Sequence, residues 1–146
     1  MNANVINSLN EILADSIVLY QKLHHFHWRV QGRGFFQLHA KFEEMYNHFA
    51  GVSDEVAERI LMIGGEPLAS LKQALEISSV KESNAVPAAS DMVIELRSEL
   101  NSFRSKIRSA VDQAEEAGDR GSVGLLDPIA DALDKEIWML DAFLAE

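Results

Sequence analysis

Two histidines and three carboxylates form the pattern with the clearest chemical meaning in this sequence. His39 and Glu43 are four residues apart, so they share one face of a helix. The same spacing joins Asp54 to Glu58, and all four positions fall within an arc of about 100°. His27 precedes them across a glycine-containing turn, which places it at the height of His39. Imidazole nitrogens and carboxylate oxygens together suit first-row divalent metals such as Fe(II).

The distance along the helix divides these residues into two half-sites. Eleven residues separate Glu43 from Asp54, which is roughly 16 Å and too far for one ion to bridge. An antiparallel two-fold partner would place each half-site against the complementary half of the other chain. A di-iron site inside one bundle uses Glu-x-x-His on two helices, and no Glu here has a His at that spacing. The spacing therefore predicts a metal site between two copies of the chain.

Long helices must position these residues. Apolar and small side chains recur at helical spacing over residues 5–30 and 36–63, and each stretch ends in glycines. Residues 64–90 interrupt the pattern, but four small or apolar side chains within them predict one short helix: Leu68, Leu71, Ala74 and Leu75. A third long helix is predicted from residue 90 to 118, and a fourth runs to the end of the chain.

The helix ends are predicted from capping residues. Asn4 and Ser90 are the expected N-caps of the first and third long helices. The start of the fourth has two interpretations. Asp127 and Pro128 could provide an N-cap and a first-turn proline, or Ser122 could cap an earlier start and leave Pro128 to kink the helix.

The helices and their connections define the fold class. Four long helices, two tight connections and one of about 25 residues describe an all-α, ferritin-like four-helix bundle. Its long crossover, containing the short helix, lies between helices two and three, which then run parallel. At this length, residues 1–146 suit a single domain with a substantial core.

Composition narrows the classes of function. The formal net charge of −10 repels nucleic-acid phosphate, and residues 1–21 contain no Lys or Arg that could form a cationic tail. The absence of cysteine excludes disulfides and thiolate metal ligands. No apolar stretch is long enough to span a bilayer, and the N-terminus lacks a signal-peptide pattern. We therefore expect a cytoplasmic protein without membrane contact.

The whole pattern resembles the signature of the Dps-type mini-ferritins. The resemblance covers nearly the whole chain, and its spacings are specific. It is carried by the stretch His27-Trp28-Arg29-Val30-Gln31-Gly32, then by residues 36–46 and 54–65, and by residues 135–144 of the last helix.

The resemblance implies roles for individual residues. By position, His27 and His39 match the family's histidine ligands, while Asp54 and Glu58 match the carboxylates that the two-fold partner supplies. Glu43 stands where many members have Asp, and the longer acid can still ligate, directly or through water. The resemblance further implies a homo-oligomeric, dodecameric shell that binds Fe(II) between subunits and oxidises it with hydrogen peroxide or, more slowly, dioxygen. Fe(III) is then mineralised in the cavity, and zinc is a possible substitute for iron at the site.

Other positions matched to the family carry weaker expectations. Trp28 matches an aromatic residue beside the site that is linked to electron transfer or radical trapping, so it is a candidate catalytic residue. Family members often line a three-fold pore with acids near the start of the last helix, for which Glu115 and Asp119 are candidates. Arg120 and Gly124 stand where many members have acids, which puts the passage of iron by that route in doubt.

Two alternative functions compete with that of a ferroxidase. One is a nucleoid DNA-binding cage with secondary ferroxidase activity, holding DNA through Mg²⁺ or a surface patch. The other is a plain helical interaction module whose five polar residues are ordinary surface. The missing basic tail disfavours the first, and the match of five spacings disfavours the second. The sequence thus predicts an iron-oxidising, iron-storing oligomer without direct DNA binding.

Overall fold

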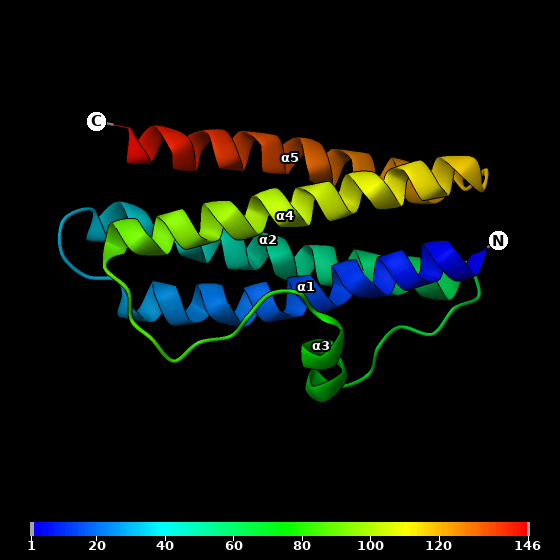
Figure 1. Ribbon diagram of the computed structural model, residues 1–146, viewed down its shortest axis with the longest axis horizontal. Coiled ribbons are helices and arrows are strands. Elements are labelled where there is room, and N and C mark those ends of the chain that lie inside the picture. The colour runs from blue at the N-terminus through cyan, green and yellow to red at the C-terminus, as the bar shows by residue number, and fades with distance from the viewer. Residues whose placement is uncertain (1, 146) are drawn as a thin grey trace.

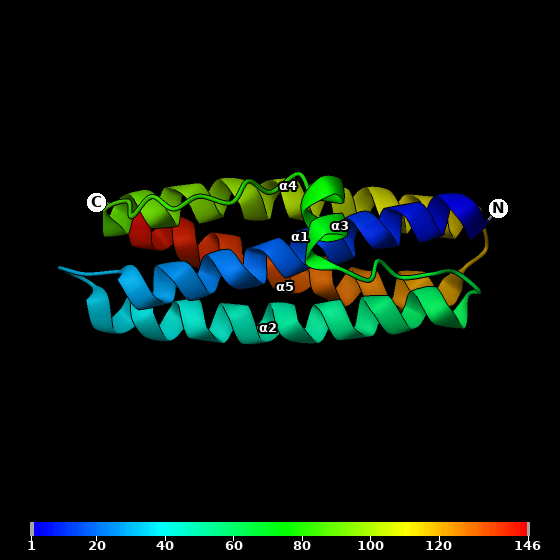
Figure 2. The same ribbon diagram turned by 90° about the horizontal axis from the view of Figure 1, so that it is seen from below.

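The computed structural model describes residues 2–145, and the regular elements within that range are all helices. Four long helices lie side by side, α1 (Asn2–Arg29), α2 (Phe35–Met62), α4 (Ala89–Glu116) and α5 (Arg120–Leu144), and the short α3 (Leu71–Ile77) lies outside them (Figure 1). Because the crossover returns along the bundle, α2 and α4 run in the same direction (Figure 2). The predicted ferritin-like bundle, with a short helix between the second and third long helices, is confirmed.

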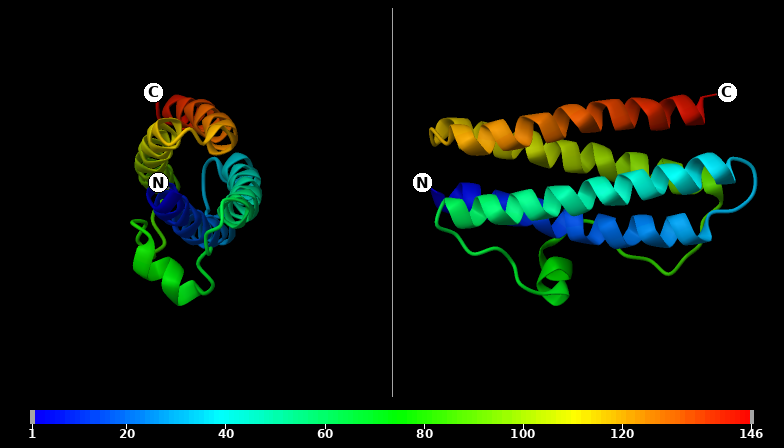
Figure 3. Two further views of the ribbon diagram at one scale, coloured as in Figure 1. Left: turned by 90° about the vertical axis from the view of Figure 1, so that its right-hand side faces the viewer. Right: turned by 180° about the vertical axis from the view of Figure 1, so that it is seen from behind.

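The hydrophobic core lies between the four long helices, which surround it in the end-on view (Figure 3, left). Four phenylalanines lie within it and are each at most 1% exposed: Phe26, Phe42, Phe49 and Phe103. Burying a side chain of this size stabilises the fold by roughly 2–3 kcal/mol. Phe49 and Phe103 meet edge to face at 5.5 Å and tie α2 to α4. Within residues 2–145, no helix combines the length and the apolarity needed to cross a membrane.

A buried aspartate of α1 holds the part of the crossover that directly follows α3. Asp15 is 1% exposed and forms an ion pair with Lys106 of α4 at 2.6 Å. The Ser78 hydroxyl and the Ser79 backbone N–H both donate to Asp15 Oδ1, at 2.7 and 2.9 Å. A buried carboxylate is tolerated when it is paired and hydrogen-bonded in this way. These contacts with Asp15 therefore fix the position of the crossover relative to α1 and α4.

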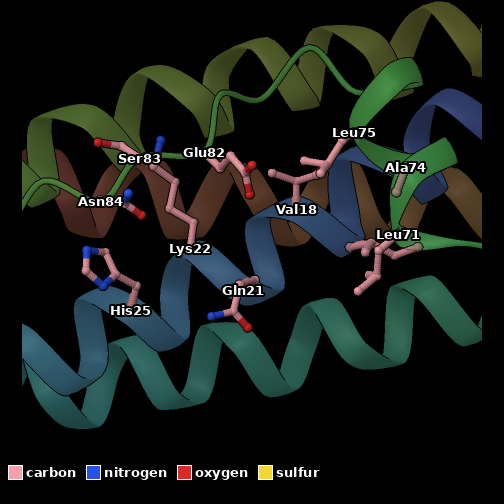
Figure 4. Close-up of a pocket in the computed structure, with 11 residues that line it drawn as sticks. Val18, Gln21, Lys22, His25, Leu71, Ala74, Leu75, Glu82, Ser83 and Asn84 are labelled. Atoms are coloured by element: carbon pink, nitrogen blue, oxygen red, sulfur yellow. The ribbon is translucent and has the colours of Figure 1, made fainter.

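A buried lysine about two turns further along α1 holds the next part of the crossover, between α3 and α4. Lys22 is 7% exposed, donates to the Lys81 carbonyl at 2.8 Å, and pairs with Glu99 of α4 at 2.6 Å. A half-open cavity of about 250 Å³ remains between α1, α3 and the crossover. Lys22 extends from α1 and Glu82 from the crossover along its polar end (Figure 4).

Two of the predicted helix caps are wrong. The chain is already helical at Asn2, so Asn4 lies inside α1. The N-cap of α4 is Ala88, whose extended backbone (φ −60°, ψ 155°) leads directly into the helix, and Ser90 lies within the first turn. Ala88 has no side-chain acceptor, so α4 begins without the side-chain cap that was predicted at Ser90.

The start of α5 follows the earlier of the two predicted alternatives. Its N-cap is Asp119, whose carboxylate accepts the Ser122 backbone N–H at 3.0 Å. Ser122 is therefore inside the helix and is not the cap, and Asp127 is not a cap either. Pro128 lies in the helix interior, where it removes one backbone hydrogen bond.

Candidate metal centre

The turn between α1 and α2 brings His27 and His39 together. Gly32 and Gly34 within this turn have φ angles of 89° and 85°. Left-handed angles of this kind favour glycine because a Cβ would meet the following carbonyl oxygen. Gly34 is also the N-cap of α2, so the turn sets where the second helix, and with it His39, begins.

Two hydrogen bonds lock the imidazole rings against the backbone. His27 Nδ1 donates to the His39 carbonyl oxygen at 2.6 Å, and His39 Nδ1 donates to the His27 carbonyl oxygen at 2.8 Å. A carbonyl only accepts, so each Nδ1 carries the proton and each Nε2 presents a lone pair. The rings stack with centroids 3.8 Å apart and planes 11° apart. Two nitrogens that could bind a metal are thus oriented in advance.

Glu43 places a carboxylate oxygen next to this pair. Its Oε1 lies 3.7 Å from His27 Nε2, too far for a hydrogen bond. The separation matches that of two ligands of one ion, each about 2.1 Å from the metal. The His27 side chain is 9% exposed and that of Glu43 is 54% exposed. An ion at this position would meet a shielded imidazole on one side and a carboxylate at the surface on the other.

Aromatic rings enclose the histidine pair on both sides. Phe35 stacks on His39 with centroids 5.0 Å apart and planes 19° apart. Tyr46 meets His27 edge to face at 5.4 Å. These contacts add to the hydrogen bonds in restricting the imidazoles to one orientation.

Tyr46 was not predicted as a site residue, although it lies in the stretch 36–46 that carries the resemblance. Its ring stacks on His24 at 3.7 Å, and burial, followed by the charge of Glu43 and the neighbouring Tyr20, raises its pKa above the ordinary value. Tyr46 lies seven residues after His39, which is two turns along the same helix face. That spacing was the available signal that it lies beside the site.

Asp54 and Glu58 are not brought to the histidines within one chain. Both carboxylates are exposed on α2, further along the helix than Glu43. Within residues 2–145, no three His, Asp or Glu side chains are grouped so that they could hold an ion. Trp28 is 61% exposed and contacts His24 at 5.3 Å. Within one chain the histidines and these two carboxylates are therefore apart, and a metal site shared between two chains stays a prediction.

Asp119, a predicted pore acid, is already engaged inside the chain. Its Oδ1 accepts from Arg59 Nη2 of α2 at 2.6 Å, and its Oδ2 accepts from the Ser122 hydroxyl at 2.6 Å. Burial alone would raise the pKa of Asp119, but the hydrogen bonds from Ser122 and Arg59 outweigh it and hold that pKa below its ordinary value. Glu115 and Arg120 are both exposed nearby, which leaves Glu115 as the more accessible of the two predicted acids.

Comparison with known proteins identifies the family. A family model for the ferritin-like domain matches residues 6–146. The chain is 44% identical over 136 residues to the DNA protection during starvation protein of Brevibacillus brevis, covering 93% of this chain and 91% of that protein. The chain belongs to the Dps-type mini-ferritins. The resemblance read from the sequence motifs is thereby confirmed.

Solved structures of Dps proteins share the whole fold. The crystal structure of a Dps protein from Bacillus brevis has a TM-score of 0.96 and 42% identity, covering 99% of this chain and 97% of that one. A Dps structure from Vibrio cholerae has a TM-score of 0.95 and 33% identity, with coverage of 99% and 91%. That protein is described as a member of a broad superfamily of ferritin-like diiron-carboxylate proteins.

Proposed function

We propose that this mini-ferritin is a ferroxidase that binds Fe(II) between two copies of the chain, oxidises it, and stores the Fe(III) mineral inside a dodecameric shell. The observation that carries the proposal is the His27–His39 pair, in which each Nδ1 donates to a backbone carbonyl and each Nε2 is left as an acceptor. A hydrogen bond from the second ring nitrogen fixes the tautomer and orientation of a metal-binding histidine. Imidazole is in turn a suitable ligand for Fe(II).

Each site takes its remaining ligands from a two-fold partner. Glu43 adds one carboxylate from the same chain as the histidines, and Asp54 of the partner subunit and Glu58 of the partner subunit complete the set. The exposure of these carboxylates on α2 supports the assignment, because a ligand to an ion shared between chains must be accessible on the isolated chain. The negative charge of these carboxylates would compensate the positive charge of the bound iron.

The oxidation needs two electrons for each peroxide. Two Fe(II) ions supply them, two protons come from water, and one hydrogen peroxide becomes two water molecules. Consuming iron and peroxide together suppresses the formation of hydroxyl radicals. This role agrees with the name of a relative, the general stress protein 20U of Bacillus subtilis, which is 38% identical over 144 residues and covers 99% of each chain.

Other first-row metals are expected to compete for the site. A structure of the Dps protein of Listeria innocua was obtained after soaking with zinc. That structure is 34% identical to this chain with a TM-score of 0.93, and the match covers 96% of this chain and 95% of that one. Mixed imidazole and carboxylate ligands accept Zn(II) as readily as Fe(II). We therefore expect zinc to inhibit iron oxidation competitively.

Stopped-flow measurement of Fe(II) oxidation, first with peroxide and then with dioxygen, tests the proposal. The wild-type protein should oxidise Fe(II) rapidly and saturably, while a His27→Ala/His39→Ala variant should fall to the rate without protein. His48→Ala is the matched control, because His48 is also on α2 but exposed and outside the pair. Equal, slow rates for wild type and the double variant would refute the ferroxidase.

Direct DNA binding is the second candidate function, suggested by the names of the relatives. Three arginines of α4 are held in ion pairs with aspartates of α5: Arg97 with Asp141, Arg104 with Asp134, and Arg108 with Asp134. Together with a net charge of −10, this pairing leaves little cationic surface for phosphate. A gel-shift assay at low salt, with and without Mg²⁺, decides the point, and retardation in either condition would establish DNA binding.

A further inference from the structure

The last turns of α2 are held against the start of α5 by one guanidinium group. These two helix ends lie at the same end of the bundle (Figure 1). Arg59 of α2 donates from Nη2 to Asp119 Oδ1 at 2.6 Å and from Nε to the Ser122 hydroxyl oxygen at 3.0 Å. Ser122 is fully buried and the Asp119 side chain is 9% exposed, so water competes little for these contacts. An arginine held through two of its nitrogens is fixed in orientation as well as in position.

The backbone of α5 makes room for this guanidinium at Gly121. A Cβ added at Gly121 would lie 2.6 Å from Arg59 Cζ, which is closer than real Cβ contacts. The guanidinium therefore packs directly on the first turn of α5, and the lack of a side chain at Gly121 permits this approach. We call Arg59, Asp119, Gly121 and Ser122 together the Arg59 clamp.

The Arg59 clamp lies on the side of α2 that is opposite the predicted metal ligands. At 100° per residue, Arg59 is about 150° from the centre of the arc that contains the four ligand positions of α2. Lys41 falls on the same line of the helix as Arg59 and pairs with Glu136 of α5 at 2.6 Å. Along residues 44–49 of α2, an open groove of about 290 Å³ lies between α2 and α5. The rotation of α2 relative to α5 therefore depends strongly on these two ion pairs.

The two halves of the metal site depend on the clamp to different extents. The imidazoles of the histidine pair are already fixed by each other's backbone carbonyls. Asp54 and Glu58 are instead exposed, and Glu58 is only four residues from the end of α2, where helices open most readily. We propose that Arg59 is a positioning residue for the shared metal site, because it holds the last turns of α2 on α5 and so orients Asp54 and Glu58 toward the histidine pair of the partner subunit. This inference rests on the proposed ferroxidase function.

The clamp affects metal affinity because ligands that are already oriented lose less conformational freedom when they bind. Replacing residues that orient metal ligands without touching the ion typically lowers the affinity by about 10–100-fold. We therefore expect loss of the Arg59 guanidinium to weaken the binding of Co(II), used as a probe for Fe(II), by roughly tenfold or more. The effect should be confined to the site to which the altered chain contributes its carboxylates.

Mixed cages of two half-site variants show which chain needs Arg59. His27→Ala/His39→Ala is the carboxylate donor and Asp54→Ala/Glu58→Ala is the histidine donor, so a two-fold pair with one of each contains one intact site. Arg59→Ala is introduced into either the carboxylate donor or the histidine donor, and isothermal titration calorimetry measures the Co(II) affinity of the intact sites. We expect roughly tenfold weaker binding in the first arrangement and unchanged binding in the second.

The comparison separates positioning from general stability. Mixed pairs of the two arrangements contain the same substitutions, so a general loss of stability would lower the affinity equally in both. Equal Co(II) affinities in the two arrangements would therefore overturn the proposal. If the two donors without Arg59→Ala gave no high-affinity Co(II) site, the shared site of the proposed function would itself be refuted.

Gly121→Ala is a second variant that keeps Arg59 and does not depend on whether Arg59→Ala assembles. The added Cβ displaces the guanidinium, while alanine is a better helix former than glycine, so α5 itself is not weakened. In the carboxylate donor Gly121→Ala should lower the Co(II) affinity, and in the histidine donor it should not. Gly124→Ala is the matched control, because Gly124 is also in α5 and nothing lies within 4 Å of its added Cβ. An effect of Gly121→Ala that is no larger than that of Gly124→Ala would contradict the role of the clamp.

Discussion

At the scale of single residues, the histidine pair shows how backbone groups prepare a side chain for chemistry. A histidine on a helix surface is free to choose its tautomer and rotamer. In this chain each of His27 and His39 is held by the carbonyl oxygen of the other, so both rings are fixed by one reciprocal arrangement. Residue types and spacing were sufficient to select these two positions. The orientation of the rings could not be read from the sequence, because it depends on how closely α1 and α2 approach.

Glu43 has its carboxylate 3.7 Å from His27 Nε2, and its contribution to metal binding can be measured directly. Glu43→Gln keeps the shape and removes the charge, so we expect Co(II) affinity to fall roughly tenfold or more, in the range typical of residues that support a metal site. Glu43→Asp shortens the side chain and widens the 3.7 Å gap to His27, so it should weaken binding less. Isothermal titration calorimetry of the assembled protein provides the affinities.

The neighbouring Glu44 is the matched control for that titration. Glu44 is also exposed on α2, but it pairs with Lys41 at 3.1 Å. Glu44→Gln should therefore leave the Co(II) affinity unchanged. Equal affinities in Glu43→Gln and Glu44→Gln would exclude Glu43 from the metal site.

At the scale of secondary structure, the helices were predictable and their first turns were not. The 3.6-residue periodicity located all four long helices, because each buries one continuous apolar face. The starts depend on tertiary contacts that local sequence does not contain. Asp119 caps α5 while Arg59, sixty residues earlier on α2, binds the same carboxylate. Asp and Ser are about equally favourable N-caps, so local preference alone did not decide between Asp119 and Ser122.

Gly34, the N-cap of α2, and Gly51, inside that helix, should respond in opposite directions to the same substitution. Gly34 has φ 85°, so Gly34→Ala forces a Cβ into the left-handed region and should destabilise the protein by roughly 1–2 kcal/mol. Gly51 is inside the helix with nothing within 4 Å of an added Cβ, so Gly51→Ala should stabilise it by roughly 0.5–1 kcal/mol. Urea denaturation measures both, and a stabilising Gly34→Ala would show that the turn does not require its left-handed angle.

The contact between Arg59 and Asp119 predicts a specific sensitivity to acid. Because the pKa of Asp119 is lower in the folded protein than its ordinary value of 3.8, its ionised form stabilises the fold above that pH. This contribution is lost as the pH falls from about 3.8 through the lowered value. The stability advantage of wild type over Asp119→Asn should thus be constant near neutrality and shrink below pH 4.

Urea midpoints measured at successive pH values test that prediction. Asp112→Asn, an exposed aspartate of α4, serves as the control and should show no comparable advantage to lose. A difference between wild type and Asp119→Asn that grows on acidification would contradict the assigned direction.

At the scale of the whole molecule, the surface of the α1–α2 hairpin indicates that something covers it. Large apolar side chains near both of its ends are widely exposed: Trp28 61%, Phe36 83%, Leu61 58% and Met62 73%. Exposed apolar groups of this size are typical of interaction surfaces. They flank the two half-sites on the same helices. A second copy placed there would bury this apolar surface and complete the proposed set of metal ligands at the same time. In the sequence alone, the separation of Glu43 from Asp54 is the sign that a second copy is needed.

Complementation between two inactive variants tests this assembly quantitatively. His27→Ala/His39→Ala retains the carboxylates, and Asp54→Ala/Glu58→Ala retains the histidines, so a two-fold pair containing one of each has one intact site and one site with both defects. Random mixing makes half of all pairs mixed, so co-assembled cages should recover about a quarter of the wild-type number of sites. Native mass spectrometry verifies the mixing, and stopped-flow burst amplitudes count the sites. A site built within one chain would give no recovery at all, because neither variant then contains a complete ligand set. Verified mixed cages without a burst would therefore reject the shared site, whereas a burst near one quarter is expected only if the histidines and the carboxylates meet across the two-fold axis.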